Sequence, residues 1–265
     1  MMRIGVLDSG VGGLIVANEL RRAFSNIGVV FIADSANFPY GNKSDEQLVD
    51  IVHDRIMLLE RMDVDIIVLA CNTASSIAER YRIKCDTPLV SIIDATVQQA
   101  TASVDSECFV VLATESTVAS GIYTKKLQSA FQRPICVREV ACQRLVSWVE
   151  ARALSTRVSD EDVRQLIDDL SIGQSSSIVL GCTHFILLEE ALRSLFPGST
   201  IVAPIEPLKD YIAQFIGDRN RISGTAPMEV YTTANPTLFA DKARKLVGLL
   251  EVVPLVPDFG GATTR

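Results

Sequence analysis

The chain has 265 residues, of which 48% are hydrophobic and 22% are charged, and its formal net charge at pH 7 is -7. This composition is typical of a globular protein that is long enough for one large domain or two small ones. The acidic balance argues against a phosphate-backbone partner, and no apolar run approaches the ~20 residues of a membrane-spanning helix, so we expect neither a nucleic acid nor a membrane as a partner.

Predicted strands and helices alternate along the chain. The strands are expected at residues 3–7, 29–33, 66–69, 89–93, 109–112, 135–140, 178–180, 200–203 and 229–232. The helices are expected at residues 13–24, 45–62, from 72 onward, 116–130, 143–153, 159–170, 185–195, 208–216 and 236–250. We interpret residues 34–43 as a loop and the tail from 253 to 265 as a loose segment.

This regular alternation is typical of parallel sheets whose two faces are covered by helices. It runs through two rounds, and each round contains a strand–cysteine–helix unit. We therefore predict an α/β fold with two similar parallel-sheet domains that face each other across the active-site cleft. The first domain is expected to comprise residues 1–94 and 207–265, and the second residues 95–206.

Two strand ends carry nearly the same segment, VLACNT around Cys71 and VLGCTH around Cys182. Open α/β sheets bind their ligands at the carboxyl ends of the strands. Two matched thiols at two such ends predict one site with a sulfur on each side. That arrangement suits a reaction that removes a proton from one face of a carbon and returns it to the other. A free cysteine is more often a small buried hydrophobe, and we keep that interpretation for Cys85, Cys108, Cys136 and Cys142.

Other strand ends carry polar motifs that have structural alternatives. The spacing in Asp8-Ser9-Gly10-Val11-Gly12-Gly13 is not that of a dinucleotide fingerprint, so a carboxylate ligand is the better interpretation. A tight turn capped by Asp8 explains the same residues equally well. His184 lies two residues from a thiol that it could assist, whereas His53 lies in a predicted helix and is interpreted as structural.

The cysteines and the first residues of the chain indicate where the protein works and whether it binds a metal ion. Asp8 interrupts the first apolar run before a signal-peptide core can form, so we expect a cytoplasmic protein with reduced thiols. The chain has six cysteines and two histidines but no C-x-x-C pair. We therefore expect no metal site.

The motifs occur in a fixed order along the chain: Asp8-Ser9-Gly10-Val11-Gly12-Gly13, Pro39-Tyr40-Gly41, Cys71-Asn72-Thr73-Ala74-Ser75, Leu112-Ala113-Thr114 with Thr117, and Gly181-Cys182-Thr183-His184. Together they resemble the glutamate racemases of the aspartate/glutamate racemase superfamily. The resemblance implies a cofactor-independent enzyme with two α/β domains that interconverts L- and D-glutamate and supplies D-glutamate for peptidoglycan synthesis.

The resemblance also assigns roles by matching motif positions. Cys71 and Cys182 would be the two acid–base residues, with Asp8, His184 and Glu150 supporting them. The substrate would be held by Ser9, Pro39, Tyr40, Gly41, Asn72, Thr73, Thr114, Thr117 and Thr183. Asp34 matches a further acid. The expected partner is a small-molecule substrate, and a homodimer is compatible with these expectations.

The chain departs from the family pattern at a few positions. Gln143 stands where the family usually has proline, and Ile186 replaces a proline expected after His184. Asp94-Ala95 stands where a charged residue and a proline are common, and Ala203-Pro204 replaces a usual Asp-Ser. None of these departures removes a thiol.

Three alternatives remain open from the sequence. A racemase for aspartate or another acidic amino acid would use the same two thiols. A two-lobed amino-acid-binding protein would bind its ligand without needing either sulfur. A thiol redox protein would join Cys71 and Cys182 in a switchable disulfide. Neither of the last two explains why Asn, Thr and His flank the cysteines.

Overall fold

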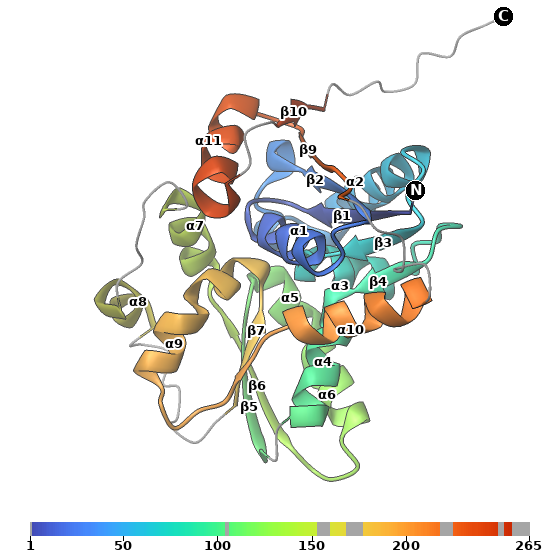
Figure 1. The fold of residues 1–265 in the computed structure, drawn as a ribbon. Helices are drawn as coiled ribbons and strands as arrows, with labels where there is room; N and C mark the ends of the chain where they lie inside the picture. The colour runs from blue at the N-terminus through green and yellow to red at the C-terminus, as the bar shows by residue number, and fades with distance from the viewer. Residues whose placement is uncertain are drawn as a thin grey trace, which may run out of the picture.

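The computed structural model describes residues 2–103, 106–152, 160–167, 177–217, 225–248 and 252–255. Its strands form two parallel sheets, one of six strands and one of four, and helices cover the faces of both (Figure 1). The predicted α/β fold class with two parallel-sheet domains is confirmed. Within the described ranges, no helix is long and apolar enough to cross a membrane.

The larger sheet has the strand order β10-β9-β2-β1-β3-β4. Its strands are β1 (Arg3–Asp8), β2 (Gly28–Ala33), β3 (Ile66–Leu69), β4 (Leu89–Ser91), β9 (Met228–Thr232) and β10 (Val253–Pro254). One face is covered by α1 (Gly12–Ala23), α10 (Ile205–Ile216) and α11 (Pro236–Val247), and the other by α2 (Asp45–Arg61) and α3 (Asn72–Arg80). Every residue of β2 and β3 is buried, as expected for strands covered on both faces.

The smaller sheet has the strand order β6-β5-β7-β8. Its strands are β5 (Cys108–Ala113), β6 (Cys136–Ala141), β7 (Ser177–Gly181) and β8 (Ile201–Val202). One face packs against α7 (Gln143–Arg152), α8 (Asp160–Ile167) and α9 (Glu189–Leu195), and the other against α4 (Ile92–Ser103) and α6 (Ile122–Ala130).

Two helices join the parts of the molecule. In Figure 1 the larger sheet lies above the smaller one, and α4 and α10 lie side by side at their junction. Ile92 and Ala95 of α4 belong to the core of the larger sheet, whereas Val97 and Ala100 belong to that of the smaller sheet. The predicted crossing points near residues 94 and 207 fall within these two helices. The predicted division of the chain into domains stays a prediction.

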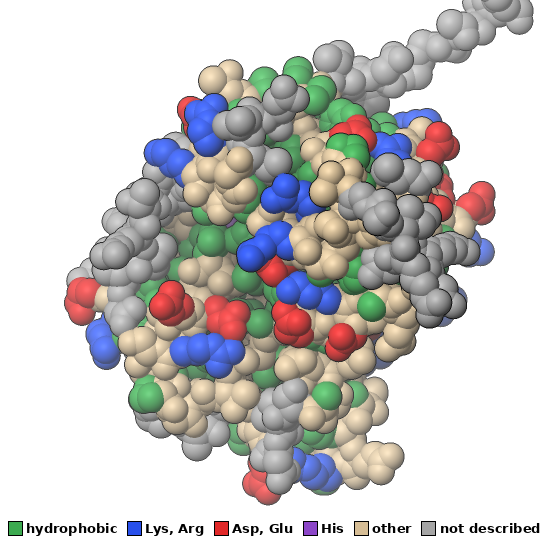
Figure 2. Space-filling view, viewed as in Figure 1, with side chains coloured by type: hydrophobic (Ala, Val, Ile, Leu, Met, Phe, Trp, Pro, Cys, Tyr) green, Lys and Arg blue, Asp and Glu red, His purple; other side chains and the backbone are tan. Residues whose placement is uncertain are grey.

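The surface at this junction mixes both signs of charge. On the face shown in Figure 2, Lys and Arg side chains alternate with Asp and Glu side chains. Lys209 of α10 illustrates this pattern, because its Nζ atom lies 2.9 Å from carboxylate oxygens of both Glu19 and Glu206.

Several predicted elements have different bounds in the structure. The strand predicted at residues 89–93 ends at Ser91, and the next two residues begin α4, a helix that the sequence analysis missed. The helix predicted at residues 116–130 is divided into α5 (Glu115–Ser120) and α6 by Gly121, whose φ of 62° is left-handed. Glycine adopts that conformation without a Cβ clash, so it can end one helix and begin the next.

Three further predictions differ from the structure. The helix predicted at residues 185–195 begins as the 3-10 helix η4 (Thr183–Leu188) before continuing as α9. The tail predicted to be loose starts with β10, which pairs with β9. The predicted loop at 34–43 contains two 3-10 turns, η1 (Ser35–Asn37) and η2 (Tyr40–Asn42). The remaining tail and the predicted helix ends at 153, 159, 168–170 and 249–250 lie outside the described residues.

Candidate active site

Both matched cysteines line one cavity between the two sheets. Cys71 lies just beyond β3 of the larger sheet, and Cys182 lies just beyond β7 of the smaller sheet. All strand pairs are parallel, so these are carboxyl ends, where a ligand site is expected. The cavity is lined by Ser9, Phe38, Pro39, Tyr40, Gly41, Cys71, Asn72, Thr73, Thr114, Val146, Cys182, Thr183 and His184. Its volume is about 10 Å³, so the site is closed around it.

Cys71 is the N-cap residue of α3 and is only 6% exposed. Burial raises the pKa of its thiol, and the nearby charge of Asp8 raises it further. Backbone N–H groups of Thr73 and Ala74 act in the opposite direction, as expected at a helix N-terminus. Burial has the larger effect, so Cys71 is held as a thiol in this structure.

Cys182 belongs to a chain of polar side chains that leads out of the cavity. Its Sγ atom lies 3.7 Å from Nδ1 of His184, whose Nε2 lies 2.7 Å from Oε2 of Glu150. The other oxygen of Glu150 accepts a hydrogen bond of 2.6 Å from Nζ of Lys242. These residues come from η4, α7 and α11, so the chain connects both halves of the molecule.

The pKa values of this chain follow from its contacts. Burial alone would lower the pKa of His184, but its hydrogen bonds to Cys182 and Glu150 raise it to about 10. Burial alone would raise the pKa of Glu150, but the hydrogen bond from His184 and the charges of His184 and Lys242 lower it to about 2. At neutral pH we therefore expect an imidazolium ion paired with a carboxylate beside Cys182.

Asp8 lies at the end of β1 and is fully buried. Oδ1 accepts a hydrogen bond of 2.8 Å from the N–H of Gly10, and Oδ2 accepts one of 2.9 Å from the hydroxyl of Thr183. Burial raises the pKa of its carboxyl group, although the charge of His184 opposes that effect. Asp8 thus connects the first strand to the segment that carries Cys182 and also acts electrostatically on Cys71.

Three buried threonine hydroxyls form a cluster where the two sheets meet. Oγ1 of Thr73 lies 2.9 Å from that of Thr114 and 3.3 Å from that of Thr117. The Thr114 and Thr117 hydroxyls are 2.9 Å apart. Beside them, Oδ1 of Asn72 accepts a hydrogen bond of 2.6 Å from Tyr123. Nδ2 of Asn72 is buried without a partner among the described residues, which leaves a donor for a ligand.

Asp34 supports the loop that carries Tyr40. Its Oδ2 accepts a hydrogen bond of 2.7 Å from the Tyr40 hydroxyl. Its Oδ1 accepts a hydrogen bond of 2.8 Å from Thr233 and lies 3.2 Å from Nε of Arg55. Asp34 is not among the residues that line the cavity, so the structure places it behind the site.

The structure gathers the predicted residues around one cavity. Asp8, Thr117 and Glu150 do not line the cavity but are hydrogen-bonded to residues that do. Four residues at or near the site were not predicted from the sequence: Phe38, Tyr123, Val146 and Lys242. Tyr123 and Lys242 lie far along the chain from the groups that they contact, so no local sequence pattern could identify them.

Cys142 is a third buried thiol near the site. Burial and the nearby Cys182 raise the pKa of its thiol to about 12, which keeps it protonated and fits the structural role predicted for it. Within the described ranges, no group of three or more His, Cys, Asp or Glu side chains could hold a metal ion.

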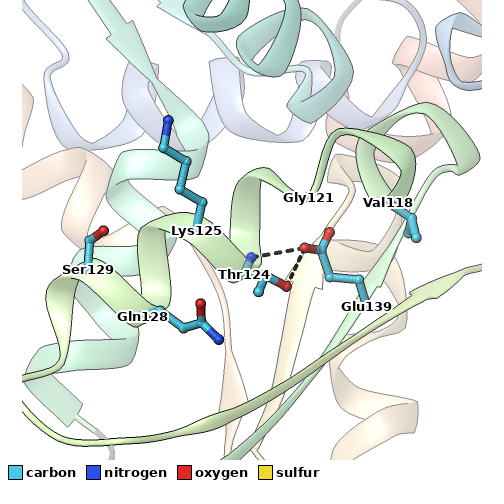
Figure 3. A pocket seen from close by; sticks show the side chains of 7 residues that line it. All are labelled: Val118, Gly121, Thr124, Lys125, Gln128, Ser129 and Glu139. Atoms are coloured by element: carbon cyan, nitrogen blue, oxygen red, sulfur yellow. Dashed lines mark hydrogen bonds between the residues drawn. The ribbon is translucent and has the colours of Figure 1, made fainter.

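A larger hollow of about 570 Å³ lies on the outside of the smaller sheet (Figure 3). It is lined by Val118, Gly121, Thr124, Lys125, Gln128, Ser129 and Glu139. Oε1 of Glu139 accepts hydrogen bonds of 2.9 and 2.7 Å from the N–H and hydroxyl of Thr124. This hollow shares no residue with the cavity of the two cysteines.

Comparisons with known proteins identify relatives of this chain. Residues 16–207 match the family model of the Asp/Glu/hydantoin racemases. The chain is 35% identical over 254 residues to a glutamate racemase of Streptococcus gordonii, covering 92% of this chain and 94% of that one. It is also similar to a glutamate racemase isoform of Bacillus anthracis, with a TM-score of 0.86, 27% identity and coverage of 97% and 98% of the two chains.

A second similar structure carries ligands. It is the glutamate racemase of Escherichia coli in complex with L-glutamate and the activator UDP-MurNAc-ala. The TM-score is 0.73 at 26% identity, and the alignment covers 96% of this chain and 97% of that one.

Proposed function

Because the chain belongs to the Asp/Glu/hydantoin racemase family, we propose that this isomerase interconverts L- and D-glutamate without a cofactor. The observation that carries the proposal is the pair of buried thiols, Cys71 and Cys182, which follow strands of different sheets and line one cavity. A single base could not easily reach both faces of a substrate carbon, whereas two opposed thiols can.

In the proposed mechanism, one cysteine acts as a thiolate and the other as a thiol. The thiolate removes the proton from Cα of the substrate, and the thiol donates a proton to the opposite face. After turnover the two cysteines have exchanged protonation states, which prepares the enzyme for the reverse direction. By the family resemblance, Cys71 would act on the D-enantiomer and Cys182 on the L-enantiomer.

The neighbouring residues suit this reaction. Glu150 would hold the imidazolium of His184 in place beside Sγ of Cys182, where it could assist proton transfer. When the reaction starts from L-glutamate, Cys71 would donate the proton, and its raised pKa keeps it protonated for that role. The free donor on Asn72 and the hydroxyls of the threonine cluster would bind substrate carboxylates. Asp8, whose charge acts on Cys71, would support that cysteine in proton transfer.

A closed site also helps to form a carbanion at Cα. Fixed donors act more strongly on developing charge when water is excluded. We further propose that the product D-glutamate supplies peptidoglycan synthesis, that the enzyme works in the cytoplasm, and that its substrate is its only required small-molecule partner.

The proposal is tested by proton NMR of the purified protein with L-glutamate in D₂O, with L-aspartate in parallel. Loss of the Cα–H signal, with D-glutamate found by chiral analysis, is the expected result. Turnover of aspartate alone would keep the mechanism and change the substrate. No exchange with either amino acid, while all thiols are reduced, would contradict the proposal and favour binding or redox functions.

Variants that lack one cysteine test which cysteine acts on which enantiomer of glutamate. We expect Cys71→Ala to abolish racemisation but to retain hydrogen exchange at Cα of L-glutamate, because Cys182 is still present. Cys182→Ala should also abolish racemisation but retain hydrogen exchange at Cα of D-glutamate, because Cys71 is still present. Selective loss of exchange from L-glutamate in Cys71→Ala would reverse the assignment.

A further inference from the structure

Gln143, the first residue of α7, buries an amide that has no hydrogen-bond partner. Both Oε1 and Nε2 are buried, and neither has a partner among the described residues. A buried amide without a hydrogen bond is costly, and such groups in native proteins call for an explanation. A ligand that supplies the missing partner is one such explanation.

The position of this amide is defined by Gly41. A Cβ built on Gly41 would lie 2.3 Å from Oε1 of Gln143 and 2.6 Å from Cβ of Thr114. Gly41 therefore lies close to both Gln143 and Thr114 at the junction of the two sheets. Gly41 and Thr114 line the active-site cavity, as does Val146, one helical turn beyond Gln143. Gln143 itself does not line the cavity, so its amide lies at the margin.

We propose that Nε2 of Gln143 donates a hydrogen bond to the side-chain carboxylate of the substrate, an inference that rests on the proposed glutamate racemase function. For proton transfer, Cα of the substrate must lie between the sulfurs of Cys71 and Cys182. The side-chain carboxylate is the group farthest from Cα, so it reaches the margin of the cavity. A carboxylate accepts hydrogen bonds and donates none, which matches an unpartnered amide N–H₂.

The side-chain amides of Asn72 and Gln143 then bind different carboxylates of the substrate. Nδ2 of Asn72 is another buried donor without a hydrogen-bond partner among the described residues, and Asn72 directly follows Cys71 in the chain. It is placed to bind the carboxylate attached to Cα, whereas Gln143 takes the distal one. A half-turn of the Gln143 side-chain amide exchanges its nitrogen and oxygen, so the donor can also occupy the position next to Gly41.

Gln143 is also one of the positions where the chain departs from the family pattern, which usually has proline there. Proline fits the first turn of a helix but has no side-chain donor. The contact is therefore a feature of this chain, and substitution of Gln143 should change substrate affinity more than the chemical step.

The test compares Gln143→Glu, Gln143→Leu and the control Gln128→Glu by racemisation kinetics with both enantiomers of glutamate. Gln143→Glu keeps the shape but places a carboxylate where the donor was, so the KM for each enantiomer should rise at least ~10-fold while kcat changes less than ~3-fold. Gln143→Leu removes the donor without adding charge and should raise KM by a smaller factor. Gln128 lines the hollow in Figure 3, so its substitution should leave both constants unchanged.

The outcomes separate this inference from the proposed function. If the wild-type protein racemises glutamate but both Gln143 variants, shown to be folded by circular dichroism, keep the wild-type KM, the inference is wrong. A fall in kcat with unchanged KM would also overturn it, because that result indicates a disturbed chemical step. If the wild-type protein does not racemise glutamate, the proposed function is wrong and the inference falls with it.

Discussion

His184 links the second cysteine to charged groups outside the cavity. One ring nitrogen lies beside Sγ of Cys182 and the other beside Oε2 of Glu150, which also binds Lys242. His184 is 2% exposed, and the side chains of Glu150 and Lys242 are 13% and 12% exposed. Removing one charged group from a buried cluster of this kind leaves the remaining charges without a partner. The stability lost in this way exceeds the net stabilisation that the complete cluster provides.

We expect Glu150→Gln to lower the free energy of unfolding, with a loss that depends on pH. The pKa of His184 is raised from its usual 6.5 to about 10, so its contribution is complete below pH 6.5 and is lost as the pH rises through 10. The pKa of Glu150 is lowered from 4.5 to about 2, so its contribution is complete above pH 4.5 and is lost as the pH falls through 2.

The loss in the free energy of unfolding caused by Glu150→Gln should therefore be greatest between pH 4.5 and 6.5, where we expect about 3 kcal/mol. Urea unfolding curves of both proteins across this range and up to pH 10 measure it. Glu190→Gln, which changes an exposed carboxylate on α9, is the control. A deficit that does not change with pH would contradict the assigned contacts.

The cysteines should differ in their reaction with iodoacetamide at pH 8. Only the thiolate is reactive, and burial raises the pKa of the thiols of Cys71 and Cys142. Cys108 and Cys136 are exposed, so iodoacetamide can reach them, although the hydrogen bond with Cys136 raises the pKa of the Cys108 thiol. We expect these two to be alkylated first, with activity retained, as measured by peptide mass spectrometry. First labelling of Cys71 would contradict the protonated state that the structure indicates.

At the scale of elements, the site depends on the close approach of α1 to η4. A Cβ on Gly12 would lie 2.5 Å from Oγ1 of Thr183 and 2.8 Å from the backbone nitrogen of His184. The absence of a side chain at Gly12 thus lets the helix lie against the segment that carries the second cysteine. This explains part of the glycine-rich motif in terms of packing rather than anion binding.

Gly12→Ala should displace η4 and impair catalysis. Because small displacements of reacting groups are costly, we expect activity to fall by about 100-fold and the free energy of unfolding by ~1–3 kcal/mol. Gly28→Ala is the matched control, since its Cβ would meet only the flexible Arg3 side chain at 3.2 Å and Met2 O at 3.7 Å. Equal activity of the two variants would show that the contact at Gly12 does not position the site.

The sequence predicted the strands better than the helix ends. Continuous apolar runs such as residues 66–69 identify covered strands because the local pattern is sufficient. The whole of α4 was missed, because Ile92 and Ile93 at its start continue an apolar run that suits either a strand or a buried helix. The break at Gly121 depends on one left-handed residue, which periodicity does not reveal.

At the scale of the whole molecule, the small cavity predicts that the site must open to admit a substrate. A cavity of about 10 Å³ holds roughly one water molecule, so an amino acid the size of glutamate, the proposed substrate, needs more room than this structure leaves. Contacts that cross the junction include the hydrogen bond of Thr183 to Asp8 and that of Lys242 to Glu150.

Hydrogen exchange followed by mass spectrometry should detect this opening. We expect saturating D-glutamate to slow amide exchange in η2, η4 and the first turn of α7, because a bound substrate favours the closed form. Exchange within the central strands β1 and β5 should not change. An exchange pattern that is identical with and without D-glutamate would contradict ligand-linked closure.

By itself, the sequence determined the α/β class and the position of both cysteines at strand ends, whereas the wider set of polar site residues was implied by the family resemblance. These features are local, because hydrophobic periodicity and a strand–cysteine–helix unit are each contained within a short segment. Only the tertiary structure decided that Lys242 completes the chain from His184, that Tyr123 binds Asn72 and that Gln143 buries an unpartnered amide. Those contacts join residues whose separation along the chain carries no periodic signal, so they are set by how the two sheets pack.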